Sequence, residues 1–458
     1  MDFRVILKNL PEVRSPTEKK LSFNVKLKWT LIVLIAFFVM SNISLYGLSN
    51  NALERFEYLA VIMGTSFGSI ISLGIGPIVM ASIILQLLVG SQILEIDTST
   101  VEGKKFFSGL QKLLVFFFII FEAVIYVYMQ GLQPVPGFAG ILIFQLILGG
   151  LVIVFMNELS EKWGFGSGVS LFIAAGVSWR LVSASFSFLD TEGRFHAAGA
   201  VVSLVYHLIN SGEPGAGQGV MLALAAILAT VILFLIVVWA QSLKIEIPLS
   251  YDRLRGYSMK WPLQFFYASV IPVILTAALI SNIQLFGGLL QNWLGHPTFL
   301  GNIVNGVPVS GFLFWVGSTN IPERIIQGNW EWVLIGQTLG HIIFYMFFAA
   351  LFSVFWVKTS GMDAAAQANN ILKSGLQIAG FRKDKRILES ILARYVMPLT
   401  IMGGMAIGLL AALADVLGAL VGGTALLLGI MIIFQFYQNI AQQHAMDMNP
   451  ALKKMMGA

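Results

Sequence analysis

The stretch "SLGIGPIV" at residues 72–79 decides how this chain folds. It lies in an uncharged run of 32 residues, 59–90, which as one straight helix would measure about 48 Å. The hydrocarbon core of a bilayer is only about 30 Å thick. Gly and Pro are the poorest residues for a helix interior, and Gly74, Gly76 and Pro77 stand within four positions of one another. The sequence therefore predicts a helix break at these three residues, at membrane depth.

The composition identifies the class of protein. Of the 458 residues, 57% are hydrophobic and only 11% are charged, whereas about 25% of the residues of a soluble domain are charged. The chain has no cysteine, which excludes disulfides, thiol nucleophiles and thiolate metal sites. Its five histidines are scattered, and no nucleotide-binding loop is present. The sequence predicts an integral membrane protein that is not an enzyme and has no cofactor or metal.

Apolar runs long enough to cross a bilayer need about 20 residues each. The chain contains ten of them, and the predicted fold class is an all-α integral membrane protein with ten transmembrane helices. The ten predicted spans are 30–48, 71–92, 110–131, 138–157, 169–189, 220–242, 263–286, 332–357, 396–416 and 424–441.

The distribution of positive charge predicts the orientation. All but four of the 28 Lys and Arg residues lie at the termini or in the loops that follow even-numbered spans. The four exceptions are Arg55, Arg180, Arg194 and Arg324. Loops rich in Lys and Arg stay in the cytoplasm, so both termini are predicted to be cytoplasmic.

Two long predicted inside loops, 243–262 and 358–395, concentrate the positive charge. The first carries Arg253 and Arg255, and the second carries the run "RKDKR" at 382–386. Topology alone would make these loops basic. A docking surface for an anionic partner is the other interpretation, because the charges cluster.

The segment before the break, residues 52–69, mixes apolar with small residues and is predicted to enter from the outer face and stop partway. Irregular backbone at membrane depth needs surrounding protein or a water-filled cavity, so a cavity and a packed kink both remain open. The central parts of the second, seventh and tenth spans carry no ionisable residue, and Glu122, followed by His341, is the main intramembrane candidate. An uncharged constriction closes by dewetting and suits cargo of variable chemistry.

Several long motifs, in order along nearly the whole chain, resemble one family. The run "SLGIGPIVMASIILQLLVG" (72–90) resembles the second transmembrane segment of SecY, the central (alpha) subunit of the Sec protein-conducting channel, in its archaeal form. The other similar stretches are "LPEVRSPTEKKLSFNVKLKWT" (10–30), "GFGSGVSLFIAAGVS" (164–178), "KIEIPLSYDRLRG" (244–256), "GFRKDKRILESILARYVMPLT" (380–400) and "GGTALLLG" (422–429).

The resemblance implies an hourglass pore between two pseudo-symmetric, inverted halves. The implied division is a cytoplasmic N-terminal segment with an interfacial helix (1–29), an N-terminal half (30–189) with a re-entrant plug helix at about 52–69, an external linker (190–219), a C-terminal half (220–441) and a cytoplasmic tail (442–458). The helix break would end the plug and start the pore wall.

The same resemblance assigns roles to individual residues. The apolar ring at the waist of the pore would be Ile75, Val79, Val169, Ile173, Ile274 and Leu428. A lateral gate between spans 2–3 and 7–8 would include Met80, Glu122 and Asn282, with Met80 standing where the family often has a small polar residue. The ribosome would contact Arg253, Arg255, Arg382 and Lys383.

The implied partners are the small membrane subunits SecE (gamma) and Sec-beta, the ribosome, the nascent or signal-bearing polypeptide and the lipid bilayer, without DNA. The implied location is the plasma membrane. Two other classes stay open at this point. A secondary transporter would also use inverted halves and a broken helix, although midplane charges are missing here. A non-conducting scaffold would only anchor a complex.

Overall fold

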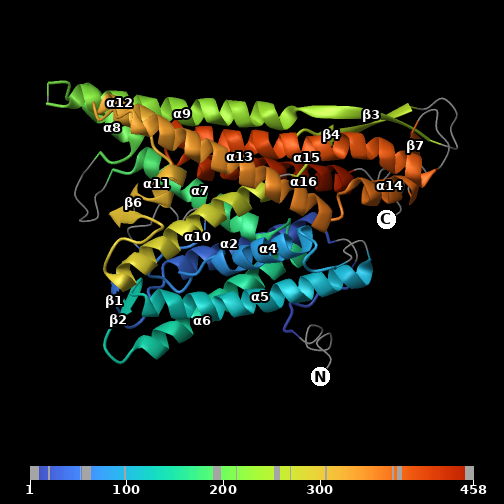
Figure 1. Ribbon diagram of the computed structural model, residues 1–458, viewed down its shortest axis with the longest axis horizontal. Coiled ribbons are helices and arrows are strands. Elements are labelled where there is room, and N and C mark those ends of the chain that lie inside the picture. Colours follow the sequence, from blue (N-terminus) through green and yellow to red (C-terminus); the bar gives the residue numbers. More distant parts are fainter. Residues whose placement is uncertain are drawn as a thin grey trace.

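The computed structural model describes residues 10–18, 21–51, 53, 63–96, 100–188, 197–212, 214–251, 258–268, 270–304, 307–373, 376–378 and 384–448. Within these ranges, nine helices are long and apolar enough to cross a membrane, and α4 (Gly76–Gly90) is a shorter apolar helix. The long helices lie side by side along one axis (Figure 1). The predicted all-α membrane architecture is confirmed.

Among the described residues, the nine long helices correspond to nine of the ten predicted spans, and α4 corresponds to the remaining one, 71–92. They are α2 (Phe23–Ser41), α5 (Val101–Tyr128), α6 (Ala139–Trp163), α7 (Gly168–Phe186), α9 (Ala216–Ser242), α10 (Ile271–Leu294), α13 (Val333–Thr359), α15 (Lys385–Val416) and α16 (Gly423–Met448).

Four of these helices begin well away from the predicted start. Helix α5 begins at Val101 rather than at residue 110, and α15 begins at Lys385 rather than at residue 396. Helix α2 begins at Phe23 rather than at residue 30, and α10 begins at Ile271 rather than at residue 263. A strand occupies the chain up to Gln264, and Pro272 lies in the first turn of α10. Proline fits the first turn of a helix because it lacks an N–H and its φ is already helical, so it fixes the later start.

The connections contain short helices and hairpins that the sequence did not predict. The predicted external linker contains α8 (Ala200–Ile209), and the other short helices are α11 (Phe312–Val316), α12 (Ile321–Ile326) and α14 (Ala364–Lys373). The strands are β1 (Leu48–Asn51), β2 (Leu132–Pro134), β3 (Lys244–Tyr251), β4 (Ser258–Gln264), β5 (Asn302–Val304), β6 (Val307–Ser310) and β7 (Leu376–Ile378). β1 pairs with β2, β5 with β6, and β3 with both β4 and β7, all antiparallel.

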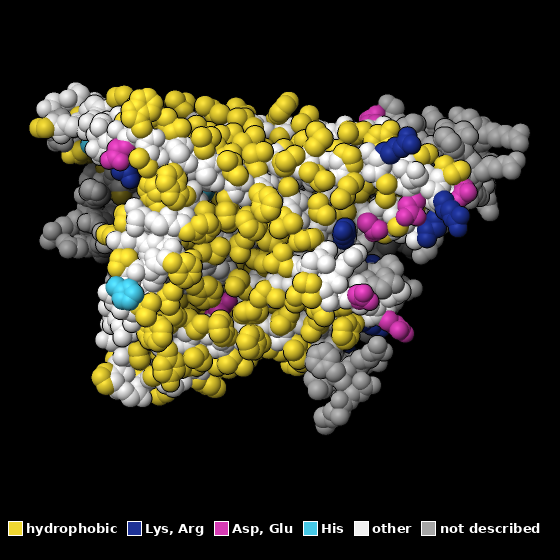
Figure 2. All heavy atoms as spheres, viewed as in Figure 1, with side chains coloured by type: hydrophobic (Ala, Val, Ile, Leu, Met, Phe, Trp, Pro, Cys, Tyr) yellow, Lys and Arg dark blue, Asp and Glu magenta, His cyan; other side chains and the backbone are white. Residues whose placement is uncertain are grey.

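The two ends of the bundle differ in charge. Strands β1, β2 and β6 lie at one end, and β3, β4, β7 and helix α14 lie at the other (Figure 1). Lys and Arg side chains gather at the end that carries β3 and α14, which we call the basic end, and a hydrophobic belt lies between the two ends (Figure 2). This is the asymmetry on which the predicted orientation rests.

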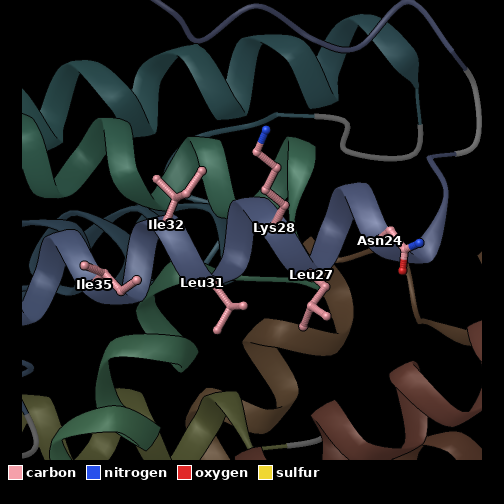
Figure 3. A pocket seen from close by; sticks show the side chains of 6 residues that line it. All are labelled: Asn24, Leu27, Lys28, Leu31, Ile32 and Ile35. Atoms are coloured by element: carbon pink, nitrogen blue, oxygen red, sulfur yellow. The ribbon is translucent and has the colours of Figure 1, made fainter.

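The apolar outer surface continues along α2. A shallow groove of about 410 Å³ runs along this helix and is lined by Asn24, Leu27, Lys28, Leu31, Ile32 and Ile35 (Figure 3). Ile35 is 61% exposed, and so large an aliphatic exposure fits contact with lipid chains rather than with water.

One large apolar cluster joins helices from both predicted halves, namely α2, α4 and α7 with α9, α10, α13, α15 and α16. A second cluster packs α4, α5 and α6 against α10. Because buried apolar surface is the main contribution to packing between these elements, the two halves share a core beside α4.

Candidate functional site

The predicted helix break is a compact turn that precedes α4. Gly74 has a left-handed φ of +53°, and a side chain there would collide with the carbonyl oxygen of Met63. The N–H of Ile75 donates to that carbonyl at 2.9 Å. The hydroxyl of Thr65 lies 2.7 Å and 2.8 Å from the carbonyl oxygens of Ile71 and Ser72, and donates to them. The backbone groups freed by the break are therefore bonded inside the bundle, as a non-aqueous interior requires.

Helix α4 itself begins at Gly76, with Pro77 in its first turn. Its 15 residues measure about 22 Å, short of the roughly 30 Å of a hydrocarbon core. The remaining distance is covered by the turn at residues 63–75, which is not helical.

The six predicted ring residues come from different elements and meet in one apolar cluster. Ile75 and Val79 lie at the start of α4, Val169 and Ile173 on α7, Ile274 on α10 and Leu428 on α16. Five of them are buried, and Val169 is partly buried against the same cluster. Next to Leu428, a side chain at Gly429 would lie 2.6 Å from Val177 on α7, so α16 and α7 are in close contact at this level. An uncharged aliphatic cluster of this kind excludes water and ions.

The described part of the predicted plug lies against this cluster. A Cβ placed on Gly64 would lie 3.5 Å from a side-chain carbon of Ile75 and 3.3 Å from Cβ of Phe172, the neighbour of Ile173. The end of the predicted plug therefore packs on two ring elements. Residues 52 and 54–62 of that segment lie outside the described residues.

The three predicted gate residues lie on α4, α5 and α10. Glu122 is 0% exposed, and neither of its carboxylate oxygens has a hydrogen-bond partner among the described residues. Asn282 donates its amide to the carbonyl of Ala278 at 2.8 Å, while its Oδ1 accepts no hydrogen bond from them. Met80 packs in the same apolar cluster as Ile283, the residue after Asn282. The seam between α4–α5 and α10 therefore contains buried polar atoms that the structure leaves unpaired.

Sequence reasoning missed several residues of this seam. Gln86 on α4 is buried, and its Oε1 also has no partner in the described part of the chain. It stands seven residues after Val79 and hence on the same helix face, which is the signal that could have found it. Gly90, at the end of α4, packs directly on the ring of Phe355 in α13. Nothing in the sequence near Gly90 or Phe355 indicates the contact between them.

A second polar cluster lies inside the C-terminal half, and all of its members but His341 Nε2, which has no hydrogen-bond partner among the described residues, are hydrogen-bonded. His341 on α13 places Nδ1 2.6 Å from the carbonyl of Val316 and Nε2 3.4 Å from a carboxylate oxygen of Asp415 on α15. Thr424 on α16 donates both its N–H, at 2.6 Å, and its hydroxyl to Asp415. The hydroxyl of Tyr345 lies 3.4 Å from that of Thr424. The sequence indicated His341 but not this network, because its members are up to 108 positions apart.

Comparison with known proteins gives the family. The SecY family profile matches residues 69–437. The "Protein translocase subunit SecY" of Methanothermobacter thermautotrophicus is 42% identical to this chain over 99% of the chain and 98% of that protein. The chain belongs to the SecY family.

Solved structures of similar chains share the fold of this SecY-family protein. One, described as "The structure of a protein conducting channel", has 34% identity, a TM-score of 0.82 and 99% coverage of each chain. Sec61 in the canine ribosome-channel complex from the endoplasmic reticulum has 33% identity, a TM-score of 0.79 and the same coverage. The SecY match includes all six predicted ring residues and all three predicted gate residues.

The basic loops of this SecY-family chain are joined by a sheet. Strand β3 pairs with β7, with Leu249 opposite Ile378, so the loops predicted at 243–262 and 358–395 lie together. Asp384 caps α15 by accepting the N–H of Arg386 at 2.8 Å. Arg253, Arg255, Arg382 and Lys383, the predicted ribosome contacts, lie outside the described residues. Among the described residues, no group of three or more His, Asp or Glu side chains could hold a metal ion.

Proposed function

We propose that this chain forms the pore of a protein-conducting channel, and that the apolar cluster beside the helix break is its constriction. The observation that carries the proposal is that six aliphatic residues from α4, α7, α10 and α16 belong to one apolar cluster, with Gly64 of the plug segment next to Ile75. Aliphatic side chains form no directional bonds, so they can close around any passing side chain. No step of this process needs a catalytic residue.

In the closed channel, the ring and plug keep ions out because an apolar constriction is not wetted. A polypeptide that enters displaces the plug segment and replaces it as the filling of the ring. The turn at 63–75 lets the plug move without unfolding α4, because the helix begins only at Gly76.

We infer that hydrophobic segments leave sideways between α4–α5 and α10–α13. Each Leu, Ile, Phe or Val at a helix centre favours the membrane by about 0.3–0.6 kcal/mol, whereas a Lys, Arg or Asp costs about 2.5–3.5 kcal/mol. Ten apolar residues therefore favour lipid by roughly 3–6 kcal/mol, and one or two charges cancel that preference. The unpaired polar atoms of Glu122, Gln86 and Asn282 support an opening seam, because opening gives them access to water or to cargo.

The basic end is inferred to face the cytoplasm of a cell whose plasma membrane holds the channel. There the paired loops would dock a ribosome through Arg253, Arg255, Arg382 and Lys383, and SecE and Sec-beta would complete the channel complex. Ribosomal RNA is polyanionic, so binding through these residues weakens steeply with salt.

The pore assignment is tested by Leu428→Ala, with Ile433→Ala as the matched control on α16. Leu428 is buried in the cluster, whereas Ile433 is 49% exposed on the outer face of the same helix. In planar bilayers, the first variant raises the resting ion conductance several-fold and the second leaves it unchanged. Deleting residues 54–66, or replacing Ile75 and Val79 with Gly, has the same effect as Leu428→Ala. Parental conductance in all three variants contradicts the pore assignment.

The docking assignment is tested by the double substitution Arg253→Glu and Arg255→Glu. Ribosome co-sedimentation falls in this variant and not in Arg324→Glu, because Arg324 lies on α12 at the opposite end. Unchanged co-sedimentation of the double variant removes these two residues from the docking surface.

A further inference from the structure

A small hollow beside the proposed constriction is lined mainly by carboxamides. It lies between the end of α9, the residues Gln264, Phe266 and Val270, and α16, with a cavity volume of about 140 Å³. Five of its lining residues are amides: Gln241, Gln264, Gln435, Gln438 and Asn439. None of its lining residues is charged. We call this feature the amide hollow.

The amide hollow lies directly beside two residues of the proposed ring. Val270, which lines it, accepts the backbone N–H of Ile274 at 3.2 Å and so stands one helical turn before it. Met431, which also lines it, follows Leu428 by three residues, and Gln435 follows by seven, so both share the face of α16 that carries Leu428. The hollow lies on the side of the ring that faces the basic end, because Gln241 lies at the end of α9 that leads into β3, Gln264 ends β4, and Gln435 lies on the part of α16 that runs toward that end (Figure 1).

The chemistry of the lining fits a polypeptide main chain. Each residue of a chain in transit presents an N–H and a C=O that need partners when water is limited. A carboxamide donates and accepts in the same way as a peptide group, and it does so whatever the side chain of the passing residue. Within the described part of the chain, the five amide side chains make no hydrogen bonds to other residues, so they are available.

A charged lining at this place would hold back cargo of one sign and attract the other. A wholly apolar lining would leave the main chain unpaired at the entrance to an apolar ring. We propose that the amide hollow binds the main chain of an extended polypeptide just before it enters the ring, without reading its sequence. The inference rests on the proposed channel function.

Photocrosslinking with an arrested precursor tests the position of the hollow. A benzophenone amino acid is introduced at residue 435 or 438 of the full chain in membranes, and at Tyr437 as the control, because Tyr437 is 66% exposed on another face of α16. Protease protection of the precursor reports independently that the channel is occupied. Adducts from 435 and 438 but not from 437 support the proposal. A protected precursor with no adduct from 435 or 438 overturns it, whereas failure to protect any precursor overturns the channel function itself.

A second experiment tests the chemistry. The triple variant Gln264→Leu, Gln435→Leu and Gln438→Leu is compared with Gln435→Glu combined with Gln438→Glu, and with Tyr437→Leu as the control. The leucine variant slows acidic, basic and neutral precursors alike, by roughly the fivefold factor of one lost hydrogen bond or more. The glutamate variant slows acidic precursors and spares basic ones. Parental rates for every precursor in both variants overturn the proposal.

Discussion

Two carboxylates within the helix bundle, Asp415 and Glu122, differ in their hydrogen bonding. Asp415 is 13% exposed, accepts two hydrogen bonds from Thr424 and faces His341 at 3.4 Å. Glu122 is 0% exposed, and its oxygens have no hydrogen-bond partner among the described residues. A buried polar atom left unpaired costs about 1–3 kcal/mol. The unpaired carboxylate of Glu122 therefore destabilises the folded state locally.

The difference follows from what each carboxylate lies between. Asp415 on α15 contacts His341 on α13 and Thr424 on α16, and all three helices belong to the C-terminal half. Glu122 faces Gly76 at the start of α4, beside the seam with α10. A fully bonded network at that seam would hold the two sides together. If the seam opens as proposed, the comparison means that polar groups are hydrogen-bonded within one half and left unbonded between the two sides of the seam.

The largest effect is expected from Asp415→Ala. The substitution leaves the N–H and hydroxyl of Thr424 without their acceptor and removes the carboxylate that faces His341, and it lowers the free energy of unfolding by about 3 kcal/mol. Thermal unfolding in detergent, followed by the fluorescence of the 10 tryptophans, measures it. Asp415→Asn keeps an acceptor for Thr424, so its free energy of unfolding falls by less. If Asp415→Ala is as stable as the parent, the hydrogen bonds of Asp415 do not stabilise the C-terminal half.

The next effect has the opposite sign. Glu122→Met replaces the unpaired carboxylate by an apolar side chain of similar size and raises the free energy of unfolding by about 2 kcal/mol. Glu122→Gln, which leaves unpaired polar atoms in place, changes it little. The same unfolding assay measures both variants. A loss of stability in Glu122→Met would mean that this carboxylate is bonded after all, and the comparison would fail.

A smaller effect is expected where α4 packs against α13. Gly90→Ala pushes a methyl group against the ring of Phe355 and lowers the free energy of unfolding by about 1 kcal/mol. Gly140→Ala is the control, because a side chain at Gly140 meets no atom within 4 Å. That variant is about 1 kcal/mol more stable, since alanine is the better helix residue. If both variants change stability equally, α4 and α13 are not in the contact described.

The smallest effect is expected for a third carboxylate, at the surface. Glu12 pairs with Lys162, whose hydrogen bond lowers the pKa of the Glu12 carboxyl against the raising effect of partial burial. Since the folded pKa lies below the unfolded value of about 4.3, the pair stabilises the fold above that pH, and the stabilisation is lost as the pH falls through the folded pKa.

Because Glu12 is 64% exposed, solvent screening reduces the contribution to below about 0.5 kcal/mol. Glu12→Gln is therefore slightly less stable than the parent at pH 7, and the difference is smaller at pH 3. Melting curves at the two pH values measure this. A difference that grows in acid would assign the stabilisation to another group.

Much of the fold followed from local properties of the sequence. The spans could be predicted because hydrophobicity and length are local, and the break because Gly74 and Pro77 constrain their own backbone. The start of α10 was predicted wrongly because apolar residues such as Leu263 continue from β4 into the loop. Hydropathy alone cannot separate a buried strand end from a span.

The candidate site was predicted unevenly for the same reason. The predicted ring residues, such as Ile274, are indistinguishable from core residues by pattern, and only the family resemblance singled them out. Gln86 and Phe355 were missed because a single amide or ring within an apolar span carries no periodic signal. The amide hollow was missed because Gln241, Gln264 and Gln435 come from three separate elements.

The sequence by itself determined the ten membrane segments, the helix break and the charge asymmetry, since each depends on residues close together in the chain. Only the tertiary structure decided which carboxylate is bonded, how α4 meets α13, and that β3 pairs with β7. These are contacts between residues far apart in the chain, and they depend on how complete helices pack. Local composition does not encode that packing.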